Sequence, residues 1–158
     1  MDIVSHGLWG GIAFGRTGKR LWLIAFLFGL WPDLFAFTIV FIQYLFRGYF
    51  IHGPIPAIPP YVHLLYGISH SLVVAVSVLL LAWLFFRSRA AVVAAWPLHI
   101  LFDIVTHDVQ FFPTPFLWPF STPYVDGIPW SMPWVFWMNW GALVVLYVVW
   151  WFSKRKRT

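Results

Sequence analysis

Two histidines and an aspartate recur at four-residue spacing in an apolar stretch of this sequence, at His99, Asp103 and His107. Residues four and eight positions apart lie on nearly the same face of an α-helix, so these side chains would form one polar stripe. Imidazole and carboxylate groups together suit Zn²⁺, Mn²⁺ or Fe²⁺, and they can also transfer protons in catalysis. The stripe predicts one wall of a metal site or of a proton-transfer site.

Residues of the same chemical types occur in three other apolar stretches. His6 lies near the start of the chain, Asp33 directly follows Pro32, and His70 lies between two serines whose hydroxyls can bond the imidazole or a neighbouring carbonyl. An ionisable side chain inside a membrane is costly unless another residue or a cavity compensates it. Taken singly, a histidine in a span is more often a helix–helix hydrogen-bonding group, and Asp33 could pair with an arginine or relay protons. A metal site therefore requires these residues to converge.

The composition predicts an all-α, polytopic membrane protein with a single domain, residues 1–158. Of its residues 61% are hydrophobic, 22% are aromatic and only 9% are charged, which is more apolar surface than a soluble domain of this length can bury. The absence of cysteine excludes disulfides, thiolate metal sites and thiol nucleophiles. The net charge of +5 comes from short basic clusters at the ends of apolar runs, which is typical of membrane topology signals rather than of nucleic-acid binding.

Five apolar segments must position the candidate residues. Four are long enough to predict spanning helices, and the first, short and rich in glycine, predicts an N-terminal membrane-inserted helix packed closely in the bundle. The segments cover residues 3–15, 21–46, 61–86, 90–107 and 134–152. The first segment lacks the preceding basic residues of a signal peptide, so we expect it to be retained. Pro32 interrupts the second segment and predicts a kink beside Asp33.

The connections differ in composition and in expected role. Residues 47–60 are rich in proline and predict a surface loop that is not regular helix; we expect His52 there to be solvated and His63, just beyond, to lie near the interface. Residues 108–133 form a longer loop rich in proline and aromatic residues. An apolar loop of this length is more often a functional lid than a passive connector.

The distribution of basic residues predicts which side of the membrane faces the cytoplasm. If the connections alternate between two sides, residues 16–20, 87–89 and the C-terminal tail share one side and carry nine of the ten basic residues. That side, with the C-terminus, is cytoplasmic by the positive-inside rule. At about 1.5 Å per residue, the candidates lie between the opposite surface and roughly 18 Å below it. In order of depth they are His107, Asp103, His99, His70 and Asp33, with His6 in the same outer half.

This convergence predicts a metal centre beneath the lid, open to the non-cytoplasmic side. Its expected ligands hold one divalent ion, or two bridged by an aspartate, with zinc favoured and manganese or iron possible. They are His6, Asp33, His70, His99 and Asp103. An open coordination position would hold a water whose pKa the metal lowers to about 7. We expect His107 and Asp103 to be the catalytic residues. His107, at the mouth of the site, would contact substrate or transfer protons. It is also a weaker candidate for a metal ligand.

Short motifs spread over most of the chain resemble those of the inner-membrane, metal-dependent hydrolases described as LexA-regulated or YdjM-like. The matching pieces are Ser5-His6, Pro32-Asp33, Gly67-Ile-Ser-His70-Ser71, His99-Ile-Leu-Phe-Asp103 and Leu117-Trp-Pro-Phe-Ser121. The family is viewed as a membrane-embedded relative of bacterial zinc-dependent phospholipases C, so the resemblance implies phosphoester hydrolysis with the same five metal-binding residues. Many members have a His-Arg pair where this chain has Leu65-Tyr66, and an arginine there would bind phosphate.

The leading hypothesis is a hydrolase of the cell inner membrane that acts on a lipid or lipid-linked phosphoester, with membrane lipid and no nucleic acid as its partner. One alternative is a transporter or channel that conducts protons or metal ions, and another is a structural protein in which the polar cluster only joins helices. A haem site with two axial histidines is disfavoured because aspartates lie among the histidines. The metal, the substrate and the oligomeric state stay open.

Overall fold

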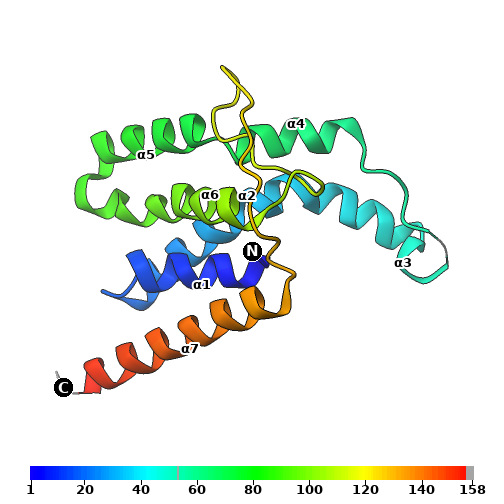
Figure 1. Ribbon diagram of the computed structural model, residues 1–158. Helices are drawn as coiled ribbons and strands as arrows, with labels where there is room; N and C mark the ends of the chain where they lie inside the picture. The colour runs from blue at the N-terminus through cyan, green and yellow to red at the C-terminus, as the bar shows by residue number, and fades with distance from the viewer. Residues whose placement is uncertain (53, 156–158) are drawn as a thin grey trace.

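The computed structural model describes residues 1–52 and 54–155, and within them the chain is helical with no strand. The predicted all-α class is confirmed for this part of the chain. The helices are α1 (Ile3–Phe14), α2 (Lys19–Phe46), α3 (Tyr49–His52), α4 (Pro60–Ser69), α5 (Leu72–Phe86), the 3₁₀ helix η1 (Arg87–Ala94), α6 (Ala95–Thr106) and α7 (Pro133–Arg155) (Figure 1). The side chain of His52 lies outside the described structure, as do Lys156 and Arg157 of the predicted basic tail.

Three helical stretches are long and apolar enough to cross a membrane: Lys19–Phe46, Leu72–Thr106 and Pro133–Arg155. Their outer surfaces are apolar, since Phe85 and Trp137 are 77% and 70% exposed. The middle stretch consists of α5, η1 and α6, and Figure 1 shows α5 and α6 as two arms lying side by side. The core between these arms contains Ala75, Trp96 and Ile100. A bilayer would cover the apolar surfaces that the bundle itself leaves exposed.

The predicted helix over residues 61–86 is wrong because it is interrupted between α4 and α5. The backbone N–H of His70 bonds the Tyr66 carbonyl and ends α4, while the Ser71 hydroxyl accepts a hydrogen bond from the N–H of Val74 and begins α5. Serine is a favoured N-cap residue because its oxygen satisfies an otherwise unpaired N–H of the first turn. The interruption makes His70 the C-cap of α4 and not a residue in the middle of a longer helix.

Two other predicted segments begin or continue differently in the structure. The predicted segment 90–107 starts in 3₁₀ geometry, and its α-helical part begins only at Ala95. Residues 47–60 include one helical turn, α3, before the prolines start, so this connection is not wholly irregular. The predicted segment 21–46 forms one helix, α2, which runs for 28 residues with Pro32 inside it and is not interrupted there as predicted.

Glycines allow α1 to lie directly against α2. A Cβ atom on Gly10 would come within 2.6 Å of the Ala25 carbonyl oxygen, and one on Gly29 within 2.5 Å of the His6 carbonyl oxygen. Small residues permit such close approach of helix backbones within a membrane bundle. The packing confirms the expectation of a glycine-mediated contact and places His6 next to α2.

The long connection 108–133 is attached to the end of α6. The N–H groups of Gly127, Ile128 and Trp130 bond the carbonyls of His107, Val105 and Thr106. The last carbonyls of a helix have no partner within the helix, so the loop supplies one for each of these three. It also contacts the start of α5, where the Phe116 carbonyl accepts a hydrogen bond from the Leu72 N–H. The loop therefore lies across the ends of both arms.

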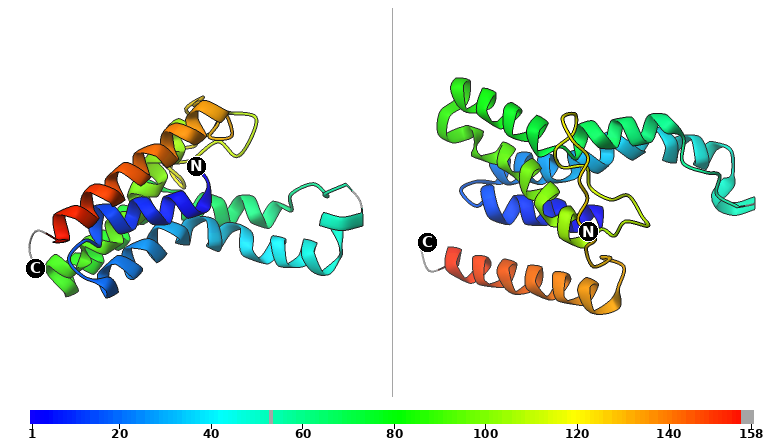
Figure 2. Two further views of the ribbon diagram at one scale, coloured as in Figure 1. Left: turned by 90° about the horizontal axis from the view of Figure 1, so that it is seen from below. Right: turned by 45° about the horizontal axis from the view of Figure 1, so that its top comes forward.

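The basic connections meet at one end of the bundle. In Figures 1 and 2, the turn between α1 and α2, η1 and the C-terminal end of α7 all lie at the same end. Arg16, Arg87 and Lys154 belong to these three places. The alternation of connections that the charge pattern requires is therefore compatible with the arrangement of the helices.

Candidate metal centre

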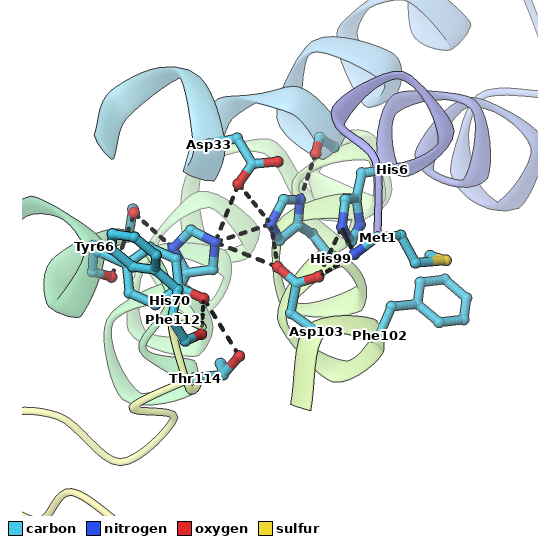
Figure 3. Close-up of polar contacts among 12 residues, drawn as sticks. Met1, His6, Asp33, Tyr66, His70, His99, Phe102, Asp103, Phe112 and Thr114 are labelled. Carbon is cyan, nitrogen blue, oxygen red and sulfur yellow. Dashed lines mark hydrogen bonds and ion pairs between the residues drawn. The ribbon is translucent and has the colours of Figure 1, made fainter. Parts of the chain in front are cut away.

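Four metal-ligating side chains from three elements converge in the middle of the bundle. Asp33 comes from α2, His70 from the end of α4, and His99 and Asp103 from successive turns of α6 (Figure 3). Each offers one ligand atom, and these atoms all lie within 4.8 Å of one another. This group could hold a metal ion, and its members were all predicted from the sequence as ligands.

The hydrogen bonds of His99 direct an unprotonated nitrogen into the group. Its Nδ1 lies 2.7 Å from the carbonyl oxygen of Gly29. A carbonyl oxygen only accepts, so Nδ1 carries the proton and donates it, and Nε2 is left with its lone pair. Nε2 faces the group, 3.0 Å from Asp103 Oδ2. Metal-bound histidines are typically oriented in this way by a carbonyl or carboxylate on the far side of the ring.

A hydrogen bond at Nδ1 also orients His70, with the hydroxyl of Ser69 in place of a backbone carbonyl. Its Nδ1 lies 2.9 Å from the hydroxyl of Ser69, which itself donates to the Tyr66 carbonyl. When the hydroxyl donates to Tyr66 in this way, the neutral imidazole donates to it from Nδ1, and Nε2 is then the lone-pair nitrogen. The ring of Tyr66 stacks on His70 at 3.7 Å between centroids, which restrains the ring from one face. The expectation that a flanking serine bonds the imidazole is confirmed.

The donor set has an unsatisfied buried atom where a cation would lie. Within the described residues, Asp103 Oδ2 is buried and has no hydrogen-bond partner. Its neighbours are the Nε2 atoms of His99, at 3.0 Å, and His70, at 3.4 Å; when both rings are neutral with the proton on Nδ1, neither Nε2 has a proton to donate. Three electron-rich atoms thus face one another, which is costly in a buried site without a cation. The residues fit a divalent metal ion.

His6 lies against this group without belonging to the four converging ligands. Its Nε2 is 2.9 Å from Asp103 Oδ1, and its ring stacks on His99 at 3.6 Å between centroids. The amino group of Met1 is 2.6 Å from the same carboxylate oxygen and also contacts Thr106 Oγ1 at 3.2 Å. Asp103 Oδ1 is thus hydrogen-bonded on the α1 side, while Oδ2 faces the two histidines (Figure 3).

A largely apolar cavity of about 350 Å³ leads to the group from the α2 side. Asp33 and His107 both line it, and Phe37, Phe41 and Phe112 form part of its apolar wall. Asp33 Oδ1 lies 3.5 Å from His70 Nε2 at the edge of the group. Asp33 is therefore the ligand candidate that a molecule in the cavity would reach.

His107 lines the cavity at the end of α6. It is the residue that ends α6, and its Nδ1 donates to the Asp103 carbonyl oxygen at 3.2 Å, which leaves Nε2 as the accepting nitrogen. Burial lowers the pKa of His107, so the ring is neutral near pH 7. A neutral imidazole with a free lone pair is able to accept a proton. His63 lies outside the group and stacks on Phe112.

Several residues that shape the site were not predicted from the sequence. Gly29 contributes through its backbone carbonyl, which no side-chain pattern reveals. Tyr66 was given no role in the site, yet its hydroxyl donates to the Phe112 carbonyl and attaches the long loop to α4. Thr114 lies beside the same hydroxyl, at 3.5 Å. The second flanking serine, Ser71, bonds the Trp118 carbonyl, as expected for a hydroxyl beside His70.

Comparison of the chain with protein-family models, with curated proteins and with solved structures gives no match. The site is therefore described by its own geometry.

Proposed function

We propose that this protein is a membrane-embedded, metal-dependent hydrolase of a lipid or lipid-linked phosphoester. The observation that carries the proposal is the pair of lone-pair nitrogens, His70 Nε2 and His99 Nε2, directed at an unsatisfied oxygen of Asp103. Hydrolysis with metal-activated water requires such a donor set and an open approach to it. The apolar cavity that ends at Asp33 supplies that approach.

The chemical class of the substrate follows from the lining of the cavity. An ester group would lie near Asp33 and His107, while apolar chains would lie against Phe37 and Phe41 of α2. Ligand sites in general combine apolar walls with a few polar groups that fix orientation. A membrane lipid or a lipid-linked phosphoester has this division between a polar ester and long apolar chains.

In the proposed reaction the metal ligands are Asp33, His70, His99 and Asp103, with His6 supporting Asp103. A divalent ion held there, zinc by preference, would polarise the phosphoryl group and lower the pKa of a water to about 7. His107 accepts a proton at Nε2, and the Asp103 carboxylate, bridging α1 and the two histidines, keeps the groups in position. General acid–base groups of this kind contribute about 10²–10⁴-fold to rate.

The proposed membrane arrangement extends the charge argument. Four crossings are made by α2, by α4 with α5, by η1 with α6, and by α7, and α1 is inserted beside them. The basic end faces the cytoplasm of the inner membrane, and the metal centre and the 108–133 lid face the other side. Membership of the YdjM-like hydrolases is part of the same proposal. Tyr66 stands in the position of the family's arginine, so the metal would be the group that binds the phosphate.

Metal analysis of the full chain purified in detergent is the first test. We expect stoichiometric transition metal in the wild-type protein and its loss in His99→Ala and in Asp103→Asn. His63→Ala is the matched control, because His63 lies near the same cavity wall but outside the ligand group, and it should retain the metal.

Absence of metal from the wild-type protein, or its retention in both ligand variants, would contradict the proposal. Activity is then measured with a fluorescent phospholipid in mixed micelles. Metal binding without hydrolysis, together with metal uptake into proteoliposomes, would instead support a transporter. Loss of thermal stability in the ligand variants with no dependence on metal would support a purely structural cluster.

A further inference from the structure

A second concave site lies at the basic end of the bundle, between the end of α1 and the last turns of α7. This groove has a volume of about 740 Å³. It is separate from the cavity that leads to the metal centre, since the two share no lining residue. Its ligand therefore does not depend on the proposed hydrolytic function.

The basic part of the groove lies beyond the polar contacts that join α7 to the start of the chain. Trp140 donates to Asp2 at 3.1 Å, Trp9 donates to Asn139 at 2.8 Å, and Tyr147 donates to the Leu8 carbonyl at 2.9 Å. Asn139 and Trp140 precede the groove-lining residues of α7, and Tyr147 follows only the first of them, Leu146. In Figures 1 and 2, α7 lies to one side of the bundle, next to α1.

The groove has an apolar half and a basic half. The apolar half is lined by Ile12, Leu146 and Val149, and the basic half by Arg16, Thr17 and Lys154. The Lys154 ammonium lies 4.3 Å from the centroid of the Trp150 ring, and both residues line the groove. Such a division matches a molecule with a charged head and an apolar chain.

The charge at this end is uncompensated by acidic residues. The five acidic residues of the chain are Asp2, Asp33, Asp103, Asp108 and Asp126, and none lines the groove. Residues 3–32 and 127–158 contain no Asp or Glu. An anion in the basic half would therefore meet two cations without a competing carboxylate on the segments that form the groove.

We propose that the groove binds an anionic membrane phospholipid. Its phosphate lies between Arg16 and Lys154, where the guanidinium and the ammonium both donate to phosphate oxygens, and Thr17 supplies a hydroxyl donor. The Ser153 hydroxyl donates to the Val149 carbonyl at 2.7 Å and is not available as a donor to the phosphate. One acyl chain follows Leu146 and Val149. The apolar half is why a lipid, and not free phosphate, is the occupant.

Native mass spectrometry of the detergent-purified full chain tests this assignment. Phosphatidylglycerol or phosphatidylcholine is added, and the affinity for one bound lipid is measured. We expect selective binding of phosphatidylglycerol, and about 30-fold weaker binding in the Arg16→Gln/Lys154→Gln variant, since each basic contact contributes about 1 kcal/mol and 1.4 kcal/mol is a tenfold change. Val149→Trp, which fills the apolar half without changing charge, should also weaken binding.

The matched control is Lys19→Gln/Arg20→Gln, which removes two charges from the same end of the bundle but outside the groove. It should retain binding. An equal loss of phosphatidylglycerol affinity in the two double variants would show a general surface attraction and overturn the assignment. Equal affinity for phosphatidylglycerol and phosphatidylcholine would also overturn it, as would a protein dimer with no bound lipid.

A charge-preserving variant covers the case in which Arg16→Gln/Lys154→Gln fails to fold. Arg16→Lys/Lys154→Arg should bind phosphatidylglycerol like the wild type. Loss of the preference for phosphatidylglycerol in this variant would equally overturn the assignment.

Discussion

The Nε2 atoms of His70 and His99 lie 3.1 Å apart, at hydrogen-bond distance. When both rings are neutral and donate from Nδ1, to the Ser69 hydroxyl in one case and to the Gly29 carbonyl in the other, neither Nε2 carries a proton. Two lone pairs at this distance repel unless a cation lies beside them. The contacts on the far sides of the rings therefore determine how well the site is prepared for a metal ion.

Replacing Ser69 should weaken metal binding. Ser69→Ala removes the acceptor that holds the Nδ1 proton of His70, and loss of such an outer partner typically costs 10–100-fold in metal affinity. Ser71→Ala is the matched control on the other side of His70. It removes the N-cap of α5 and should lower the free energy of unfolding by about 1 kcal/mol, with metal affinity unchanged. Zinc titration calorimetry and thermal unfolding in detergent separate the two effects, and equal affinities in the two variants would refute this role of Ser69.

Adding a methyl group at Gly29 should disturb both packing and the site. In Gly29→Ala the new Cβ would meet the His6 carbonyl oxygen at 2.5 Å, so α1 must move. We expect destabilisation of about 1–3 kcal/mol, as for other overpacked positions, and weaker metal binding because the Gly29 carbonyl holds His99. Gly141→Ala, where nothing lies within 4 Å of the added Cβ, should be neutral or stabilise α7 by up to about 1 kcal/mol. A melting temperature of Gly29→Ala no lower than that of Gly141→Ala would contradict the packing argument.

Replacing His107 should separate catalysis from metal binding. His107→Gln keeps a polar side chain at the mouth but removes the proton acceptor, so we expect phospholipid hydrolysis to fall by about 10²-fold or more with metal content unchanged. His63→Gln should hydrolyse like the wild type. Turnover and metal content are measured on the same preparations. Full activity in His107→Gln would remove this residue from the proposed reaction.

Removing the metal should destabilise the protein, and acid should have the same effect. A ligand that binds only the folded state stabilises it by about 2.7 kcal/mol at a concentration 100 times its dissociation constant, so a chelator should lower the melting temperature and added zinc should restore it. Protons compete with the metal for the Nε2 lone pairs of His70 and His99. Metal affinity should therefore fall as pH falls, and the difference between loaded and stripped protein should vanish in acid. A melting temperature that a chelator leaves unchanged at neutral pH would show that no metal supports the fold.

The sequence by itself determined the helical class, the apolar helices and the identity of the converging ligands. These features are local: helix periodicity places His99 and Asp103 on one face, and segment length with charge placement brings Asp33 and His70 to a similar depth. Depth along a helix axis can be counted from sequence because the rise per residue is nearly constant.

Only the tertiary structure decided which atoms face one another. At the break between α4 and α5 the Leu72 N–H bonds the Phe116 carbonyl of the distant 108–133 loop, and the orientation of His99 depends on a carbonyl 70 residues earlier in the chain. The same depth argument could not exclude His63, whose ring turns to Phe112, nor separate His6 from the four converging ligands. Rotation about a helix axis and the partner of each imidazole nitrogen are set by packing between distant segments, which no local pattern encodes.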